Sequence, residues 1–146
     1  MPADTTCKTL QVLDLMLDFF ADDDHWARGH YHDAHGRHCL VGAVVHFSAK
    51  HGLPHAPVMS LLEAALPRRQ IGLIAFNDRL CRNAAELCSV ILKARAIALE
   101  NAKDEQAAAA FKHRLLAELD RDWALRRAAR DEAPAEMYMP ALQLAA

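Results

Sequence analysis

The apolar positions at the start of the chain recur every three or four residues. Such spacing places them on one face of an α-helix. They are Leu10, Leu13, Leu17 and Phe20. Thr5 or Thr6 can cap this helix, because a threonine hydroxyl accepts a hydrogen bond from a free N–H of the first turn. The pattern therefore predicts a first helix over about residues 7–21.

The same reasoning predicts two helices between residues 39 and 66. The chain is apolar from Cys39 onward and stops at Gly52, in the position that glycine often takes after a helix end. This indicates a helix over 39–50. A third helix begins at 55–57, since Pro57 is tolerated in a first helical turn, and Pro67 ends it. The segment 22–38 between the first two helices has neither helical nor strand periodicity and is expected to form a long ordered loop.

Beyond residue 70 we expect one short helix and two longer ones. The apolar run 71–76 is too short for periodicity to separate helix from strand, but the chain offers no second strand to pair with it. Asn83 is expected to cap the next helix, which runs through Ile97. A break at 101–104 then precedes a last helix over about 104–131.

The last predicted helix carries an apolar stripe that must be covered. Its residues are Phe111, Leu115, Leu119 and Trp123. The stripe is expected either to fold back on the chain as an antiparallel hairpin or to meet a second copy. We thus predict an all-α, single-domain bundle of about five helices over residues 1–133, followed by a C-terminal tail over 134–146.

Composition narrows the class of protein. With 146 residues, a net charge of -2 and only 5 glycines and 6 prolines, the chain fits one helical domain better than a β-sandwich or barrel. No apolar run approaches the ~20 residues that span a bilayer, so a membrane partner is not expected. Nucleic acid is not expected either, because the chain is not basic. No secretory signal is visible, and we expect a cytoplasmic location.

Histidines are concentrated in the predicted loop. Five of the nine lie between His25 and His38, and imidazole is a preferred ligand of zinc and related ions. A metal site would use His30, His32, His35 and His38. The spacing lacks the tight ligand pairs of known zinc sites, so solvated loop histidines are the competing interpretation.

Cys39 is the candidate nucleophile. At the N-terminus of a helix, the free N–H groups would stabilise its thiolate. His38 or His46 could act as its base, and Asn77 or Asp78 could orient the imidazole. A buried, inert thiol is the alternative, because His46 lies ~10 Å along the helix from Cys39.

Three motifs occur in order along the chain: Trp26-x-x-Gly29, Gly36-Arg37-x-Cys39-x-x-Gly42-Ala43 and Phe76-Asn77-Asp78. Together they resemble the pattern of an uncharacterised bacterial and phage family of small helical domains of unknown function, over about residues 8–100. His25 stands where that family usually has glycine. The resemblance implies no activity, cofactor or substrate.

Three functional hypotheses follow. The first is a small binding or regulatory protein that acts through the 22–39 loop and the 77–78 turn, with a protein partner or by self-association. The second is a thiol-dependent enzyme with Cys39 as nucleophile, and the third is a metal-binding protein that uses the loop histidines.

Overall fold

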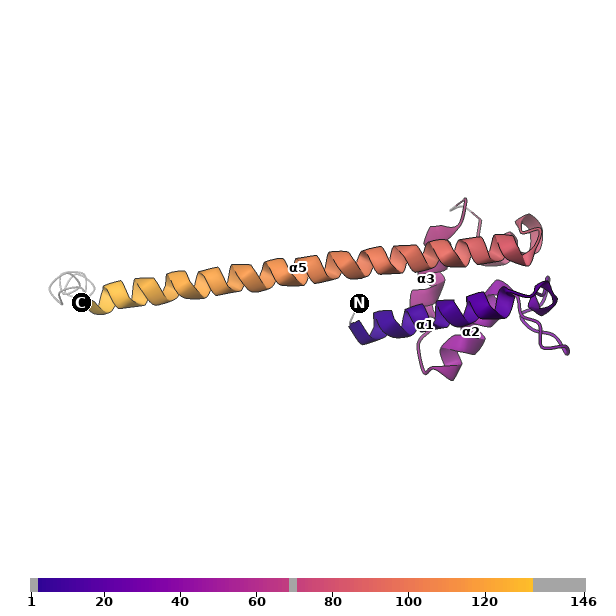
Figure 1. The fold of residues 1–146 in the computed structure, drawn as a ribbon, viewed down its shortest axis with the longest axis horizontal. Helices are drawn as coiled ribbons and strands as arrows, with labels where there is room; N and C mark the ends of the chain where they lie inside the picture. Colours follow the sequence, from indigo (N-terminus) through magenta and orange to yellow (C-terminus); the bar gives the residue numbers. More distant parts are fainter. Residues whose placement is uncertain (1–2, 69–70, 133–146) are drawn as a thin grey trace, which may run out of the picture. The chain divides into compact units, whose positions relative to one another are not determined.

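The computed structural model describes residues 3–68 and 71–132. Within them it has five α-helices, one 3-10 turn and one π-helix (Figure 1). In chain order these are α1 (Ala3–Phe20), η1 (Asp23–His25), α2 (Leu40–Lys50), α3 (Ala56–Ala65), α4 (Leu73–Ala75), η2 (Phe76–Leu80) and α5 (Ala84–Glu132). The described residues form no β-strand, which confirms the all-α prediction. The predicted tail, 134–146, lies outside the described residues.

The chain forms two compact units, residues 1–105 and 106–146. The first unit contains α1 to α4, the 22–39 loop and the first turns of α5. The described part of the second unit is the remainder of α5, over 106–132. The predicted boundary of a single helical domain at residue 133 stays a prediction.

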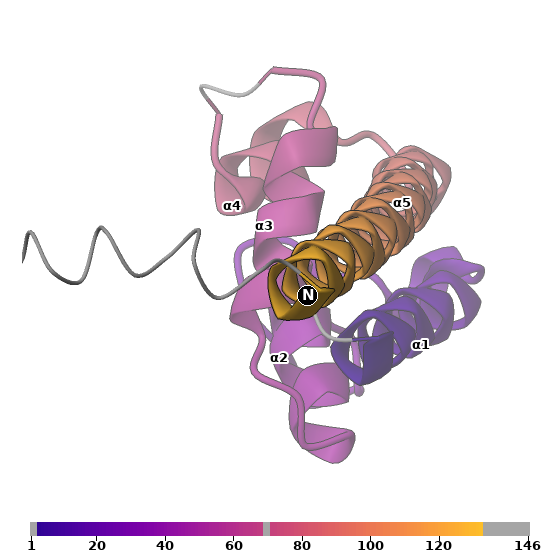
Figure 2. The ribbon, with the colours of Figure 1, turned by 90° about the vertical axis from the view of Figure 1, so that its left-hand side faces the viewer.

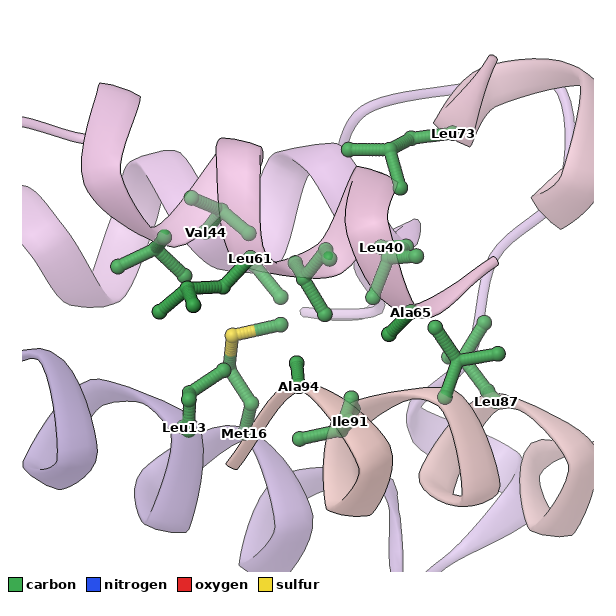
Figure 3. Close-up of a cluster of buried hydrophobic side chains, with 14 of the residues drawn as sticks. Leu13, Met16, Leu40, Val44, Leu61, Ala65, Leu73, Leu87, Ile91 and Ala94 are labelled. Carbon is green, nitrogen blue, oxygen red and sulfur yellow. The ribbon is translucent and has the colours of Figure 1, made fainter. Parts of the chain in front are cut away.

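The core of the first unit joins all of its helices. Figure 3 shows their side chains meeting: Leu13 and Met16 from α1, Leu40 and Val44 from α2, Leu61 and Ala65 from α3, Leu73 from α4, and Leu87, Ile91 and Ala94 from α5. In the end-on view of Figure 2, α1 lies on one side of the first turns of α5, and α3 and α4 lie on the other. Every residue of this buried core lies at or before Ala98.

The first helix starts earlier than predicted. Because α1 begins at Ala3, Thr5 and Thr6 lie inside it, and the prediction that one of them caps it is wrong. The Thr9 hydroxyl donates to the Thr5 carbonyl (2.7 Å), the bond to the preceding turn that satisfies a threonine inside a helix.

The predicted break at 101–104 is also wrong. α5 continues through these residues without interruption, so the antiparallel hairpin that needed a turn there does not form. No glycine or proline occurs in α5, and the polar side chains at 101–104 leave its backbone hydrogen bonds intact. Polarity alone is therefore a poor signal of a helix end.

The apolar run 71–76 is helical from Leu73 onward, which agrees with the prediction of a short helix there. α4 passes into the π-helix η2, where the Cys81 N–H donates to the Phe76 carbonyl (2.9 Å). Asn83 caps α5 as expected, since its side chain accepts from the Glu86 N–H (2.9 Å). A π-helix inserts an extra residue into a turn and changes which side chains face inward. Here it buries Asn77 completely.

Candidate functional site

The 22–39 loop is ordered by short-range hydrogen bonds. Asp22 caps the η1 turn by accepting from the Asp24 N–H (2.9 Å). Further along, the Asp33 carboxylate accepts from the His35 and Arg37 backbone N–H groups and forms an ion pair with the Arg37 side chain (2.5 Å). These bonds, with isolated bridges from His38 to Trp26 and His32, confirm the predicted long ordered loop.

Asn77 fixes the loop to the π-helix. Its side-chain oxygen accepts from the Trp26 indole N–H (2.9 Å) and from the Leu40 backbone N–H (3.0 Å). Its amide donates to the Ala27 carbonyl (3.0 Å) and to the Asp78 carboxylate (2.7 Å). One buried amide thus supplies four hydrogen bonds that join the loop, the start of α2 and η2. We call these contacts the Asn77 network.

Asp78 and Gly29 extend this network. The Asp78 carboxylate accepts from the Gly29 N–H (3.0 Å), and this bond lowers the pKa of the Asp78 carboxyl. Gly29 has φ +74°, a conformation that favours glycine. Arg28 donates to the Cys81 carbonyl, and its guanidinium stacks over the Trp26 ring at 4.5 Å from the centroid.

Gly42 lets the loop approach α2. A Cβ atom at this position would lie 1.9 Å from the backbone oxygen of Tyr31, a distance that no carbon atom tolerates. The Cys39 N–H donates to the same oxygen (3.1 Å), so the loop backbone lies directly on the first turn of α2. The motif residues Trp26, Gly29, Gly42, Asn77 and Asp78 therefore share one structural task, which is to build this loop.

Cys39 is the N-cap residue of α2, close to the predicted place in its first turn. Its thiol accepts a hydrogen bond from the Gly42 N–H (3.3 Å), the role that a serine hydroxyl usually has. The residue is 5% exposed, and burial raises the pKa of its thiol. In the described part of the chain no hydrogen bond joins Cys39, Asn77 or Asp78 to an imidazole. The thiol therefore acts as a helix cap in this structure, and its role as a nucleophile stays a prediction.

His38 and His46, the two predicted bases, do meet each other. Their rings stack with centroids 4.9 Å apart, and His32 lies 6.2 Å from His38 on the other side. Burial, and then the neighbouring His46, lower the pKa of His38, which favours its neutral form. The Nδ1 atom of His38 is buried and has no hydrogen-bond partner in the described residues.

The predicted metal ligands do not converge. Among the described residues, which include all of 22–39, no three His, Cys, Asp or Glu side chains are placed to hold one ion. His30, His32 and His35 are exposed, and the rings of His32 and His38 are tilted with centroids 6.2 Å apart. The positions of these side chains therefore give the metal hypothesis no support.

A cleft of about 650 Å³ lies beside the stacked histidines. The loop, α2, the α2–α3 connection and α3 supply its lining, which is mainly apolar apart from four imidazoles. The lining residues are Tyr31, His32, His38, Val41, Gly42, Val45, His46, His55 and Met59. A smaller hollow of about 360 Å³ lies on the other side of Tyr31 and His32 and reaches Cys39, Ile74 and Asp78.

The sequence had singled out three of the cleft's histidines, His32, His38 and His46, but as metal ligands or catalytic bases. It did not predict most of the other lining residues. Tyr31 is 57% exposed and Val45 45% exposed, both large apolar side chains in water. The one sequence signal for the cleft was Val45. It is an apolar residue outside the buried face of α2, and such a residue suggests an exposed apolar surface. Nothing in the sequence indicated that His55 and Met59 would join it.

The fold and the loop define a small all-α domain whose irregular 22–39 segment is fixed to a π-helix. The chain belongs to the family of unknown function DUF6197, whose model matches residues 5–97. The matched region lies within the first compact unit and contains the complete Asn77 network and the cleft. No curated protein and no solved structure matches the chain. Among the described residues, no helix has both the length and the apolar character needed to cross a membrane.

Proposed function

We propose that the first compact unit binds a small, neutral organic molecule in the cleft beside the stacked histidines. The observation that carries this proposal is the cleft itself, about 650 Å³ in volume and lined mainly by apolar groups. Pockets that hold small molecules have volumes of roughly 300–1,000 Å³, with apolar walls and a few polar groups that orient the ligand. The proposal keeps the binding protein and the 22–39 loop of the first sequence hypothesis, but it replaces the expected protein partner with a small molecule.

The walls of the cleft favour an aromatic or branched aliphatic ligand. Val41, Val45 and Met59 offer an apolar surface, and the Tyr31 ring and the imidazoles offer flat faces for stacking. A charged ligand would lose its hydration against such walls. The body of the ligand is therefore uncharged.

The imidazoles of the lining supply polar groups that can orient the ligand. A neutral imidazole nitrogen either donates or accepts, depending on the tautomer. A ligand with one hydrogen-bonding group beside its apolar body would match such a nitrogen.

Titration with indole tests the proposal, because indole combines a flat apolar body with one N–H donor. We expect saturable chemical-shift changes in NMR spectra at the imidazole C–H signals of His38 and His46 and at the Met59 methyl, at pH 7.5 and millimolar indole. His113, in the second unit, should not respond.

Two glutamate substitutions on α2 provide the controls. Val45→Glu places a carboxylate in the cleft and should abolish the shifts, whereas Ala49→Glu, at an exposed position outside the cleft, should leave them unchanged. Shifts that do not saturate, or that persist in Val45→Glu, would show that indole does not occupy the cleft and would overturn the proposal.

A further inference from the structure

The second compact unit exposes an apolar stripe along α5. Phe111 is 60% exposed, Leu115 44%, Leu119 55% and Trp123 62%, and Leu116 beside them is 51% exposed. Successive members of the stripe are four residues apart, slightly more than one helical turn, so they form one slanted row. Apart from the half-buried Ala117, every residue from 106 to 132 is exposed.

The exposed apolar stripe gives this part of α5 no stabilisation in water. Most of the stability of helices in proteins comes from packing of an apolar face, and isolated helices are marginal. Contiguous exposed apolar surface of this kind usually marks an interaction site. The stripe therefore needs a partner surface of similar length and shape.

The order of the side chains along the stripe is symmetric about Ala117. Phe111 and Trp123 lie six residues to either side of it, and Leu115 and Leu119 lie two residues to either side. If a second copy of the helix ran antiparallel about this point, Phe111 of each copy would lie level with Trp123 of the other. Leu115 of each copy would likewise lie level with Leu119 of the other. Such an arrangement has the two-fold symmetry of most homodimers.

The charges beside the stripe are complementary in the same arrangement. Lys112 and Asp122 lie five residues to either side of Ala117, and each is within about 40° of the centre of the stripe at 100° per residue. Antiparallel pairing about the level of Ala117 brings each Lys112 level with Asp122 of the other copy. Parallel pairing in register would instead bring every charge level with its own copy, which is repulsive.

We infer that residues 106–132 of α5 associate with the same segment of a second copy as an antiparallel pair, with the two-fold axis at the level of Ala117 along the helix and on the side of the stripe. The occupant of the stripe is thus another molecule of this protein. This inference stands independently of ligand binding in the cleft, since all the residues that line the cleft lie in the first unit.

Sedimentation equilibrium of the full chain tests the association. We expect the wild type to be a dimer at tens of micromolar and Leu119→Glu, which places a carboxylate in the stripe, to be a monomer. Ala124→Glu adds the same charge nine residues from Leu115, on the opposite side of the helix, and should remain a dimer. A wild-type monomer at every concentration, or a dimer unaffected by Leu119→Glu, would overturn the inference.

Distance measurement between spin labels tests the orientation. A label at Asp131→Cys, in a Cys7→Ser/Cys88→Ser background, lies fourteen residues from Ala117. In the antiparallel dimer the two labels should be about 40 Å apart, from a rise of 1.5 Å per residue on each side of the axis. A parallel dimer would bring their backbones to about 10 Å and would refute the arrangement.

Discussion

At the scale of single residues, one amide organises the site. Asn77 is fully buried, and its partners are 37–51 positions away along the chain, apart from the adjacent Asp78. The sequence predicts that Asn77 or Asp78 orients a catalytic imidazole. In the structure both residues hold the loop, and the catalytic role stays a prediction. The residues of the three sequence motifs therefore explain the fold of this chain directly.

Replacing Asn77 should destabilise the protein strongly. Asn77→Ala removes four hydrogen bonds and leaves the Trp26 indole and the Leu40 N–H without their acceptor, so we expect a loss of about 3 kcal/mol in the free energy of unfolding. Urea denaturation measures it. The exposed Asn101→Ala serves as a control and should change stability by less than about 0.5 kcal/mol. An equally small effect at Asn77 would contradict the role given to the network.

Cys39 should react slowly with alkylating reagents in the native protein. Burial raises the pKa of the Cys39 thiol, so little of it is in the reactive thiolate form. The reagent also reaches the buried sulfur only when the structure opens locally. Mass spectrometry after iodoacetamide treatment at pH 7.5 should show Cys39 modified at least about 100-fold more slowly than in urea. Cys7, which is exposed, is the internal control. Comparable rates at the two cysteines would revive the thiol-enzyme hypothesis.

At the scale of elements, the periodicity of apolar residues predicted the individual helices. It could not predict features that depend on contacts between distant segments. The helices around Leu13, Val44 and Leu62 follow from apolar spacing, because burial of one face is encoded within each segment. The cleft requires the loop, α2 and α3 to meet, and no single segment encodes that. The continuity of α5 was missed because polar residues at 101–104 were interpreted as a break, although helix formers tolerate polarity.

The contact between the loop and α2 gives a prediction at this scale. Alanine normally favours a helix over glycine by about 1 kcal/mol, but at Gly42 its methyl group would collide with the Tyr31 backbone. We expect Gly42→Ala to destabilise the protein by about 1–3 kcal/mol and to shift the NMR signals of the 29–38 segment.

Gly72→Ala is the matched control for this substitution. Gly72 has φ -68°, and a Cβ atom there would meet nothing within 4 Å. Thermal unfolding should show this variant as stable as the wild type. If Gly42→Ala were equally stable, the close approach of the loop would not be a constraint on the fold.

At the scale of the whole molecule, the proposed ligand binding and the proposed self-association fall in different compact units. The buried core ends at Ala98, and the family match ends at residue 97. The remainder of α5 contributes nothing to that core. Loop and cleft therefore belong to the first unit, and the proposed self-association belongs to the second.

A fragment of residues 1–105 should fold by itself. Because it retains every residue of the buried core, we expect a cooperative urea transition with a midpoint close to that of the full chain. Sedimentation should show a monomer, since the apolar stripe is absent. A fragment that fails to fold would show that residues beyond 105 stabilise the first unit, and one that dimerises would place the interface elsewhere.

The long-range bonds of the loop also set an order of events during synthesis. Asp23 accepts from the Ala84 N–H (2.8 Å), and Trp26 donates to Asn77, so the first part of the loop depends on partners that are synthesised much later. Bringing such distant segments together lowers the conformational entropy of the chain before the contacts form and stabilise it. Contacts of this kind therefore slow folding. A nascent chain that ends before residue 77 can form α1, α2 and the short-range hydrogen bonds of the loop, but it lacks the Asn77 network that joins the loop to the rest of the first unit. The loop is therefore among the last parts of the first unit to be fixed in place, and a chain truncated before the π-helix should expose its histidine-rich segment to proteolysis.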